Sequence, residues 1–143
     1  MKYIVMVSHG MFAPGLHNAL GMLAGKDRED ILSTSLKDGM GADEFAENFR
    51  KMISVVKEDD EIILFADLLG GSPLSTSANV LAEMGLLGRT KMFTGMNLPL
   101  VLGATLMKDD MDTEEMKEEM LSDAQDGIQE FTVAVEESSE DDI

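Results

Sequence analysis

The sequence of 143 residues contains no cysteine and only two histidines. Without cysteine there are no disulfide bonds, no thiol catalysis and no cysteine-ligated zinc or iron–sulfur sites. Histidines and carboxylates remain as possible metal ligands, but neither histidine stands in a cluster of acidic residues. We therefore predict neither a metal site nor a cofactor.

Basic residues are also scarce: 11 lysines and arginines stand against 28 acidic residues, which gives a formal net charge of -17. Such a charge repels the phosphates of nucleic acids and the surface of anionic membranes. No apolar run reaches the roughly 20 residues that a membrane-spanning helix needs. The amino terminus lacks the cleavage site of a signal peptide. We expect a cytoplasmic protein that binds no nucleic acid and does not insert into the membrane.

The acidic residues gather toward the carboxyl terminus, where residues 109–143 hold 15 acidic side chains and one basic side chain. We interpret this stretch as the solvated face of a helix followed by a frayed acidic tail over residues 136–143. The length of the chain suits one domain with a hydrophobic core. We expect that single domain to span residues 1–135.

Continuous apolar runs at residues 3–7 and 62–66 are typical of strands that are buried on both faces of a parallel sheet. The remaining predicted strands lie at 31–36, 89–94 and 131–135. The predicted helices lie at 14–25, 42–57, 73–85, from Pro99 onward, and at 112–129. This alternation of strands and helices predicts an α/β fold, an open three-layer sandwich whose mainly parallel sheet has helices on both faces.

Two polar side chains stand directly after the two central strands, His9 after the first and Asp67 after the strand at 62–66. Open α/β sheets bind ligands at the carboxyl ends of their strands, where the strand order reverses. If the two strands are neighbours, Asp67 can accept one ring N–H of His9 and leave the other nitrogen free to attack phosphorus. The second histidine, His17, is interpreted as a surface residue of the first helix.

The segment Gly70-Gly71-Ser72-Pro73 follows Asp67. Ser72 is predicted to cap a helix whose first position is Pro73. The glycines allow close backbone approach, and their N–H groups, the helix amino terminus and the Ser72 hydroxyl form an anion site suited to one phosphoryl group. The loop is too short for a nucleotide-binding P-loop and lacks its lysine. Together with His9, it predicts a site for phosphoryl transfer.

These elements resemble the EIIA component of the mannose family of the bacterial phosphoenolpyruvate-dependent sugar phosphotransferase system (PTS). The likeness covers about residues 1–130. Besides His9-Gly10, Asp67 and the glycine-rich loop, it includes the segment Gly95-Met96-Asn97-Leu98-Pro99 after the fourth strand. The individual motifs are short, but their order and spacing are specific together.

The resemblance implies a phosphotransferase component. His9 would accept a phosphoryl group from phospho-HPr and pass it to a histidine of the EIIB component, which serves coupled sugar uptake and phosphorylation. Asp67 would orient His9 and stabilise its positive charge. The residues implied to bind the phosphoryl group are Gly70, Gly71 and Ser72, and those implied to border the site are Gly10, Asn97 and Pro99.

The resemblance also implies a four-stranded sheet of order 2-1-3-4. In that family the sheet is extended by an antiparallel strand, which is exchanged between the subunits of a homodimer. Residues 131–135 are the candidate for this exchanged strand.

Two other functions remain open at this stage. The EIIA-like subunit of the PTS-dependent dihydroxyacetone kinase has a similar fold and an early histidine, but its acceptor is a kinase subunit with a nucleotide. Alternatively, the chain is a non-catalytic acidic interaction module of flavodoxin-like or receiver-like architecture. The chemical fate of His9 distinguishes these functions.

Overall fold

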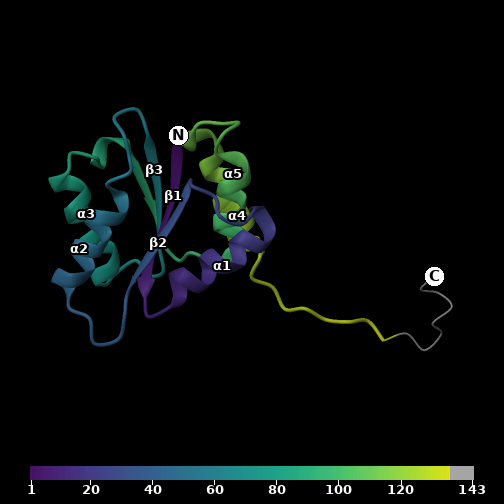
Figure 1. Cartoon of the computed structure of the whole chain (residues 1–143). Coiled ribbons are helices and arrows are strands. Elements are labelled where there is room, and N and C mark those ends of the chain that lie inside the picture. The colour runs from purple at the N-terminus through teal and green to yellow at the C-terminus, as the bar shows by residue number, and fades with distance from the viewer. Residues whose placement is uncertain (136–143) are drawn as a thin grey trace.

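The computed structural model describes residues 1–135, and the acidic tail expected at 136–143 lies outside the described residues. The centre of the fold is a four-stranded sheet of order β2-β1-β3-β4 (Figure 1). All three pairs of neighbouring strands run parallel. The strands are β1 (Lys2–His9), β2 (Ile31–Leu36), β3 (Glu61–Ala66) and β4 (Thr90–Phe93). The strand order predicted from the resemblance is confirmed.

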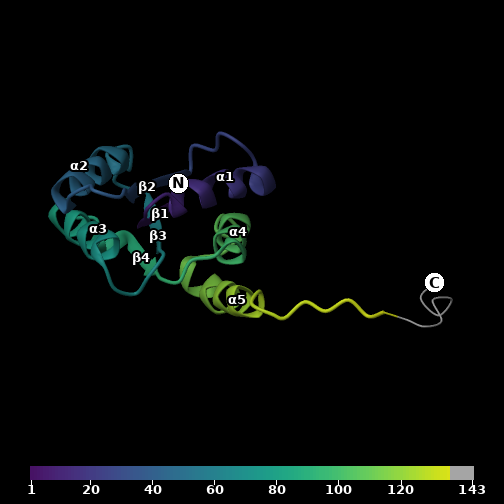
Figure 2. The same cartoon turned by 90° about the horizontal axis from the view of Figure 1, so that it is seen from below.

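Helices cover both faces of this sheet, which confirms the three-layer arrangement. One face carries α2 and α3, and the other carries α1, α4 and α5 (Figure 2). The bounds are α1 (Phe12–Ala24), α2 (Ala42–Ile53), α3 (Ser72–Glu83), the 3-10 turn η1 (Leu87–Arg89), α4 (Leu98–Met107) and α5 (Thr113–Asp126). Among residues 1–135, none of these helices combines the length and the apolar character that crossing a membrane requires.

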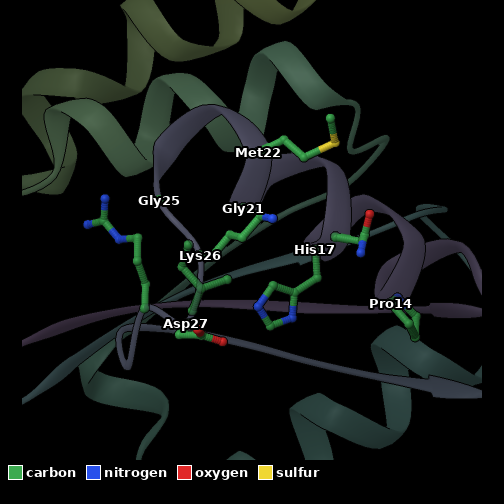
Figure 3. A pocket seen from close by; sticks show the side chains of 10 residues that line it. Pro14, His17, Gly21, Met22, Gly25, Lys26 and Asp27 are labelled. Carbon is green, nitrogen blue, oxygen red and sulfur yellow. The ribbon is translucent and has the colours of Figure 1, made fainter.

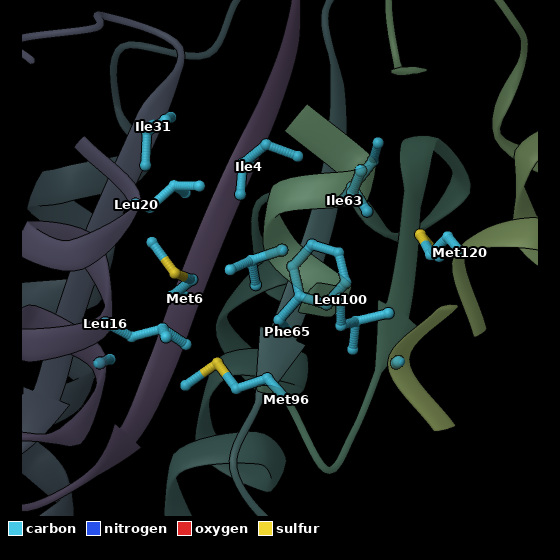
Figure 4. Close-up of a cluster of buried hydrophobic side chains, with 14 of the residues drawn as sticks. Ile4, Met6, Leu16, Leu20, Ile31, Ile63, Phe65, Met96, Leu100 and Met120 are labelled. Carbon is cyan, nitrogen blue, oxygen red and sulfur yellow. The ribbon is translucent and has the colours of Figure 1, made fainter. Parts of the chain in front are cut away.

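The apolar runs of β1 and β3 are buried on both faces, as their composition predicts. Successive side chains of a strand point to opposite faces, so β1 supplies both cores. Ile4 and Met6 pack in the core beneath α1, α4 and α5 (Figure 4). Val5 and Val7 pack in the core beneath α2 and α3. The two central strands are thereby held in the middle of the molecule.

Two predicted helices end earlier than expected. Helix α2 ends at Ile53, because the chain turns there: the Val56 N–H donates to the Ile53 carbonyl at 3.0 Å. Lys57, the predicted last residue, instead donates its N–H to the Asp60 carboxylate at 2.8 Å. Helix α5 ends at Asp126, just before a glycine. Local turn contacts thus set both ends.

The strand predicted over residues 131–135 is not formed in the described chain. Phe131, Val133 and Val135 are 88%, 70% and 87% exposed, and the segment pairs with no strand of residues 1–135. It runs as extended chain away from the end of α5 (Figure 1). β-Branched composition favours extended backbone, but a strand forms only where another strand accepts its hydrogen bonds. This path brings the segment next to no such partner in the same chain.

A buried ion pair joins three segments at the amino-terminal edge of the sheet, opposite His9. The Lys108 side chain is only 1% exposed, and its Nζ lies 2.7 Å from Oδ2 of Asp30. Arg28 donates to both oxygens of the same carboxylate at 2.9 Å. Lys2 donates to the carbonyl oxygens of Lys108 and Met111. The start of β2, the end of α4 and the start of β1 are thereby tied together.

We expect Asp30→Asn to lower the free energy of unfolding by about 3 kcal/mol near neutral pH, because it removes the main counterion of a buried lysine. The hydrogen bonds from Arg28 and Lys108 outweigh desolvation and hold the pKa of Asp30 well below its usual range. A carboxyl whose folded-state pKa is depressed stabilises the fold above its unfolded pKa, and this contribution is lost as the pH falls toward the folded pKa. The difference in unfolding free energy between the wild type and the variant should therefore shrink progressively as the pH falls below about 4.

Urea unfolding from pH 7 to pH 2 measures this difference. Asp109→Asn is the matched control, since Asp109 also contacts Lys108, at 3.2 Å, but is exposed. Asp109→Asn should lower the free energy of unfolding much less than Asp30→Asn does. An equal loss in both variants would contradict the assigned role of Asp30.

Candidate active site

The carboxyl ends of β1 and β3 meet at one edge of the sheet. His9 is the last residue of β1, Asp67 directly follows β3, and the two strands are neighbours. From here α1 passes to one face of the sheet and α3 to the other. The strand order therefore reverses between β1 and β3, which is where a crevice opens in folds of this kind.

His9 and Asp67 are joined by two hydrogen bonds. The ring Nδ1 of His9 lies 2.9 Å from Oδ2 of Asp67, and the backbone N–H of His9 donates to the same oxygen at 3.0 Å. The other oxygen, Oδ1, accepts the N–H of Leu68 at 3.0 Å. The carboxylate thus holds both the ring and the backbone of the histidine.

This contact fixes the protonation pattern of the site. Partial burial raises the pKa of Asp67, but the hydrogen bonds from His9 and Leu68 lower it by more than burial raises it. The pKa of Asp67 therefore lies below its usual range. An ionised Asp67 can only accept a hydrogen bond, and Nδ1 of His9 donates it, so Nδ1 carries the hydrogen and Nε2 carries the lone pair. The His9 side chain is 44% exposed, so a partner molecule can reach the ring.

Gly71 lies against the imidazole ring. A Cβ atom at this position would stand 2.9 Å from Cε1 and 3.2 Å from Nε2 of His9, and the backbone has a φ of +103°. Both the close approach and the left-handed backbone therefore require glycine. Gly70 shows neither constraint, since an added Cβ would have nothing within 4 Å. The second glycine of the pair is the one that the site needs.

Ser72 does not cap α3, contrary to the prediction. Gly71 occupies the cap position, no side chain caps the helix, and Ser72 is its first residue. The sharp backbone turn at Gly71 starts the helix one residue earlier than the serine-proline pattern indicates. Ser72 is exposed and directly follows Gly71, which lies against the ring of His9. The amino terminus of a helix leaves N–H groups without partners inside the helix, and such an end can receive an anion.

The residues predicted to border the site, Gly10, Asn97 and Pro99, form turns and the start of a helix. Gly10 has a φ of +57° and donates its N–H to the Leu36 carbonyl at 2.8 Å. The Asn97 side chain caps α4 by accepting the Leu100 N–H at 2.9 Å, and it donates to the Ala124 carbonyl at 3.1 Å. Pro99 lies in the first turn of α4. Among residues 1–135, none of these three residues makes a hydrogen bond to His9, and their role at the border of the site stays a prediction.

His17 is not a surface residue as interpreted; its ring is half-buried between α1 and β2. Its Nδ1 lies 2.6 Å from the Ser33 hydroxyl oxygen, and burial lowers the pKa of the ring. It lines a cavity of about 540 Å³ together with Gly21 and Lys26 (Figure 3). No residue of the His9 site lines this cavity. His17 therefore lies in a different place from the His9 site.

Four exposed apolar side chains, which we call the apolar collar, flank His9. Met11 and Phe12 follow it in the chain and are 61% and 48% exposed, while Leu68 and Leu69 follow Asp67 and are 56% and 80% exposed. Sequence analysis overlooked them because apolar residues are usually assigned to the core. Their signal is their position, directly after two polar site residues and next to glycines. Exposed apolar side chains that gather on one part of a protein surface are typical of sites that bind other proteins.

No metal centre accompanies the site. Among residues 1–135 no group of three or more histidine, cysteine, aspartate or glutamate side chains lies close enough together to hold a metal ion. The groups that the site offers are an oriented imidazole, a carboxylate, helix amides and a serine hydroxyl. This set suits the transfer of an anionic group to Nε2 of His9.

Known proteins are similar to this chain in sequence and in fold. The fructose-specific EIIA component of the PTS from Bacillus subtilis (strain 168) is 22% identical over 129 residues, which cover 90% of this chain and 86% of that protein. The structure of a PTS EIIA component from Streptococcus agalactiae is similar with a TM-score of 0.77 and 25% identity, covering 92% of this chain and 98% of the other.

A PTS IIA protein associated with the fucose utilization operon of Streptococcus pneumoniae is similar with a TM-score of 0.75 and 26% identity, covering 90% of this chain and 92% of the other. A sequence model of the EIIA-man family, described as the PTS system fructose IIA component, matches residues 3–121. The matched region runs from β1 to within α5 and includes His9, Asp67 and the loop before α3. The chain belongs to the EIIA-man family of PTS IIA components.

Proposed function

We propose that this chain is a phosphocarrier in which Nε2 of His9 accepts a phosphoryl group from phospho-HPr and passes it to a histidine of an EIIB component. The observation that carries the proposal is the contact between Nδ1 of His9 and Asp67, which leaves Nε2 as the free nucleophile beside the amino terminus of α3. Membership in the family supports the same reaction. The chain then acts as a phosphotransferase component that takes part in sugar uptake.

In the accepting step, the lone pair of Nε2 forms a bond to phosphorus while the P–N bond of the donor's phosphohistidine breaks. The electron pair of that bond returns to the donor imidazole. The proton on Nδ1 stays in place, so the phosphorylated ring gains positive charge, which the Asp67 carboxylate offsets at 2.9 Å. The phosphoryl oxygens face the helix amides and the Ser72 hydroxyl. Positioning and charge stabilisation account for most catalysis of phosphoryl transfer.

The apolar collar supports a protein as the partner. A small metabolite needs an enclosed pocket, whereas His9 lies on an open edge ringed by exposed apolar side chains. A protein that buries Phe12 and Leu69 would also exclude water from the reacting nitrogen. Both HPr and EIIB must reach the same nitrogen in turn, so they use overlapping parts of this surface.

Intact-protein mass spectrometry after incubation with phosphoenolpyruvate, enzyme I and HPr tests the function. The wild type should gain one acid-labile phosphoryl group that requires HPr, and His9→Ala should gain none. Passage of the group to EIIB, rather than to a kinase subunit with a nucleotide, separates this role from the dihydroxyacetone kinase alternative. Absence of the adduct with demonstrably active donors would favour a non-catalytic interaction module.

Gly71→Ala should slow phosphorylation of His9 by about 100-fold. The added Cβ would lie too close to the imidazole ring, so the ring must move and Nε2 is no longer aligned with the donor. Gly85→Ala is the matched control, since Gly85 also has a positive φ, +72°, but an added Cβ there would have nothing within 4 Å. Both variants should lose about 1 kcal/mol of stability from backbone strain. Stopped reactions analysed by mass spectrometry compare the rates, and equal slowing in both variants would remove Gly71 from the site.

The extended segment after α5 supports a homodimer with an exchanged strand. Phe131, Val133 and Val135 recur with the two-residue period of a strand and are exposed, while β4 pairs with β3 alone in the described chain. Extended chain of this kind can add to a free sheet edge of a second copy. We therefore place residues 131–135 antiparallel to β4 of a second subunit.

Sedimentation velocity over the micromolar range tests this exchange. Val133→Asp should shift a wild-type dimer toward monomer, because it places a charge among the apolar side chains of the segment. Ala134→Asp, one residue further on the opposite side of the segment, should have a smaller effect. A wild type that stays monomeric throughout the range would argue against the exchanged strand.

A further inference from the structure

Ser8, the residue before His9, is completely buried in β1 although it is polar. Its hydroxyl makes two hydrogen bonds. It accepts the backbone N–H of Ala13 at 2.7 Å and donates to the backbone carbonyl of His9 at 3.0 Å. One buried hydroxyl thus connects the carbonyl of the site histidine to the first turn of α1.

The Ser8 hydroxyl accepts an N–H group at the start of α1, which the residue at the cap position does not do. Met11 occupies the cap position of α1 and its side chain caps no N–H group. Serine is a preferred acceptor for the N–H groups of a first helical turn, and here the acceptor comes from the preceding strand. The first turn of α1 is thereby hydrogen-bonded to the last residues of β1.

The backbone of His9 is consequently held on both sides. Its N–H donates to Asp67, and its carbonyl accepts from Ser8. The next amide, that of Gly10, donates to the Leu36 carbonyl at 2.8 Å. With the main chain held at these points, the ring reaches Asp67 by choosing only its two side-chain torsions.

We propose that Ser8 is a positioning residue for phosphoryl transfer: its hydroxyl fixes the backbone of His9 so that Nδ1 stays on Asp67 and Nε2 stays aimed at the donor. Ser8 touches neither the ring nor the phosphoryl group, so it acts through His9. Part of this inference rests on the proposed function, since a positioned nucleophile matters only if His9 is phosphorylated.

Ser35 provides a control within the same sheet. It pairs in register with Ser8 across β1 and β2 and is 3% exposed. Its hydroxyl finds no hydrogen-bond partner among residues 1–135. Replacing Ser35 by alanine removes the same atoms from a neighbouring buried position without breaking a contact to His9.

The experiment compares Ser8→Ala with Ser35→Ala in single-turnover transfer from phospho-HPr, with the donor concentration varied. We expect the limiting rate of Ser8→Ala to fall about tenfold while the donor concentration at half-maximal rate stays unchanged, because misplacing a nucleophile affects the transfer and not the docking. Ser35→Ala should keep the wild-type rate. A wild-type limiting rate in Ser8→Ala would overturn the proposal.

A second readout does not require phosphorylation. Nitrogen-15 NMR of the His9 ring distinguishes a protonated Nδ1 from a protonated Nε2, and we expect the wild type to show one tautomer and Ser8→Ala to show a mixture. Unchanged ring shifts in Ser8→Ala would contradict the positioning role. If HPr does not phosphorylate the wild type, the proposed function fails while this measurement still tests Ser8.

Ser8→Thr and Ser8→Val cover the case in which Ser8→Ala does not fold. These two side chains have the same shape and differ in the hydroxyl, so any cost of the added methyl groups in the buried site is shared. The threonine variant should transfer about tenfold faster than the valine variant and show the purer tautomer. Equal rates and equal ring shifts in this pair would overturn the proposal.

Discussion

The pairing of β1 with β3 is the constraint on which the rest of the site depends. Parallel neighbours bring their carboxyl ends to the same edge, and this places Asp67 within hydrogen-bond distance of His9. Since the two strands send their helices to opposite faces, the edge stays open between them. One carboxylate oxygen then binds both the ring and the backbone of the histidine. Orientation, protonation pattern and access follow from this one contact.

The molecule divides its charges and its chemistry between the two edges of the sheet. At the amino ends of the strands, Lys108, Asp30 and Arg28 form a buried network that ties distant segments together. At the carboxyl ends, His9 and Asp67 orient one another through two hydrogen bonds. Such a separation lets a buried ion pair stabilise the fold without placing fixed positive charge beside Nε2. The apolar collar leaves that edge suited to contact with other proteins.

Much of this could be predicted, because the relevant signals are local. Two apolar runs of strand length, each followed by a polar residue, predict central strands with a site at their ends. The order of His9, Asp67 and the glycine-rich loop was also sufficient to suggest the family. The predicted end of the helix over residues 42–57 was less accurate, because a local sequence pattern does not encode the turn contacts that end a helix. The strand over 131–135 stays a prediction, since the described chain offers it no partner strand.

The sequence by itself determined the layer architecture and singled out His9 and Asp67 at the ends of the two central strands, since hydrophobic periodicity and residue type suffice for both. Only the tertiary structure decided the details that depend on distance. It showed that Gly71 and not Gly70 must lack a side chain, that Gly71 starts α3 in place of Ser72, and that a buried hydroxyl of Ser8 reaches His9. Each of these is a contact between residues whose spacing is set by packing of the sheet and its helices, which no local sequence pattern encodes.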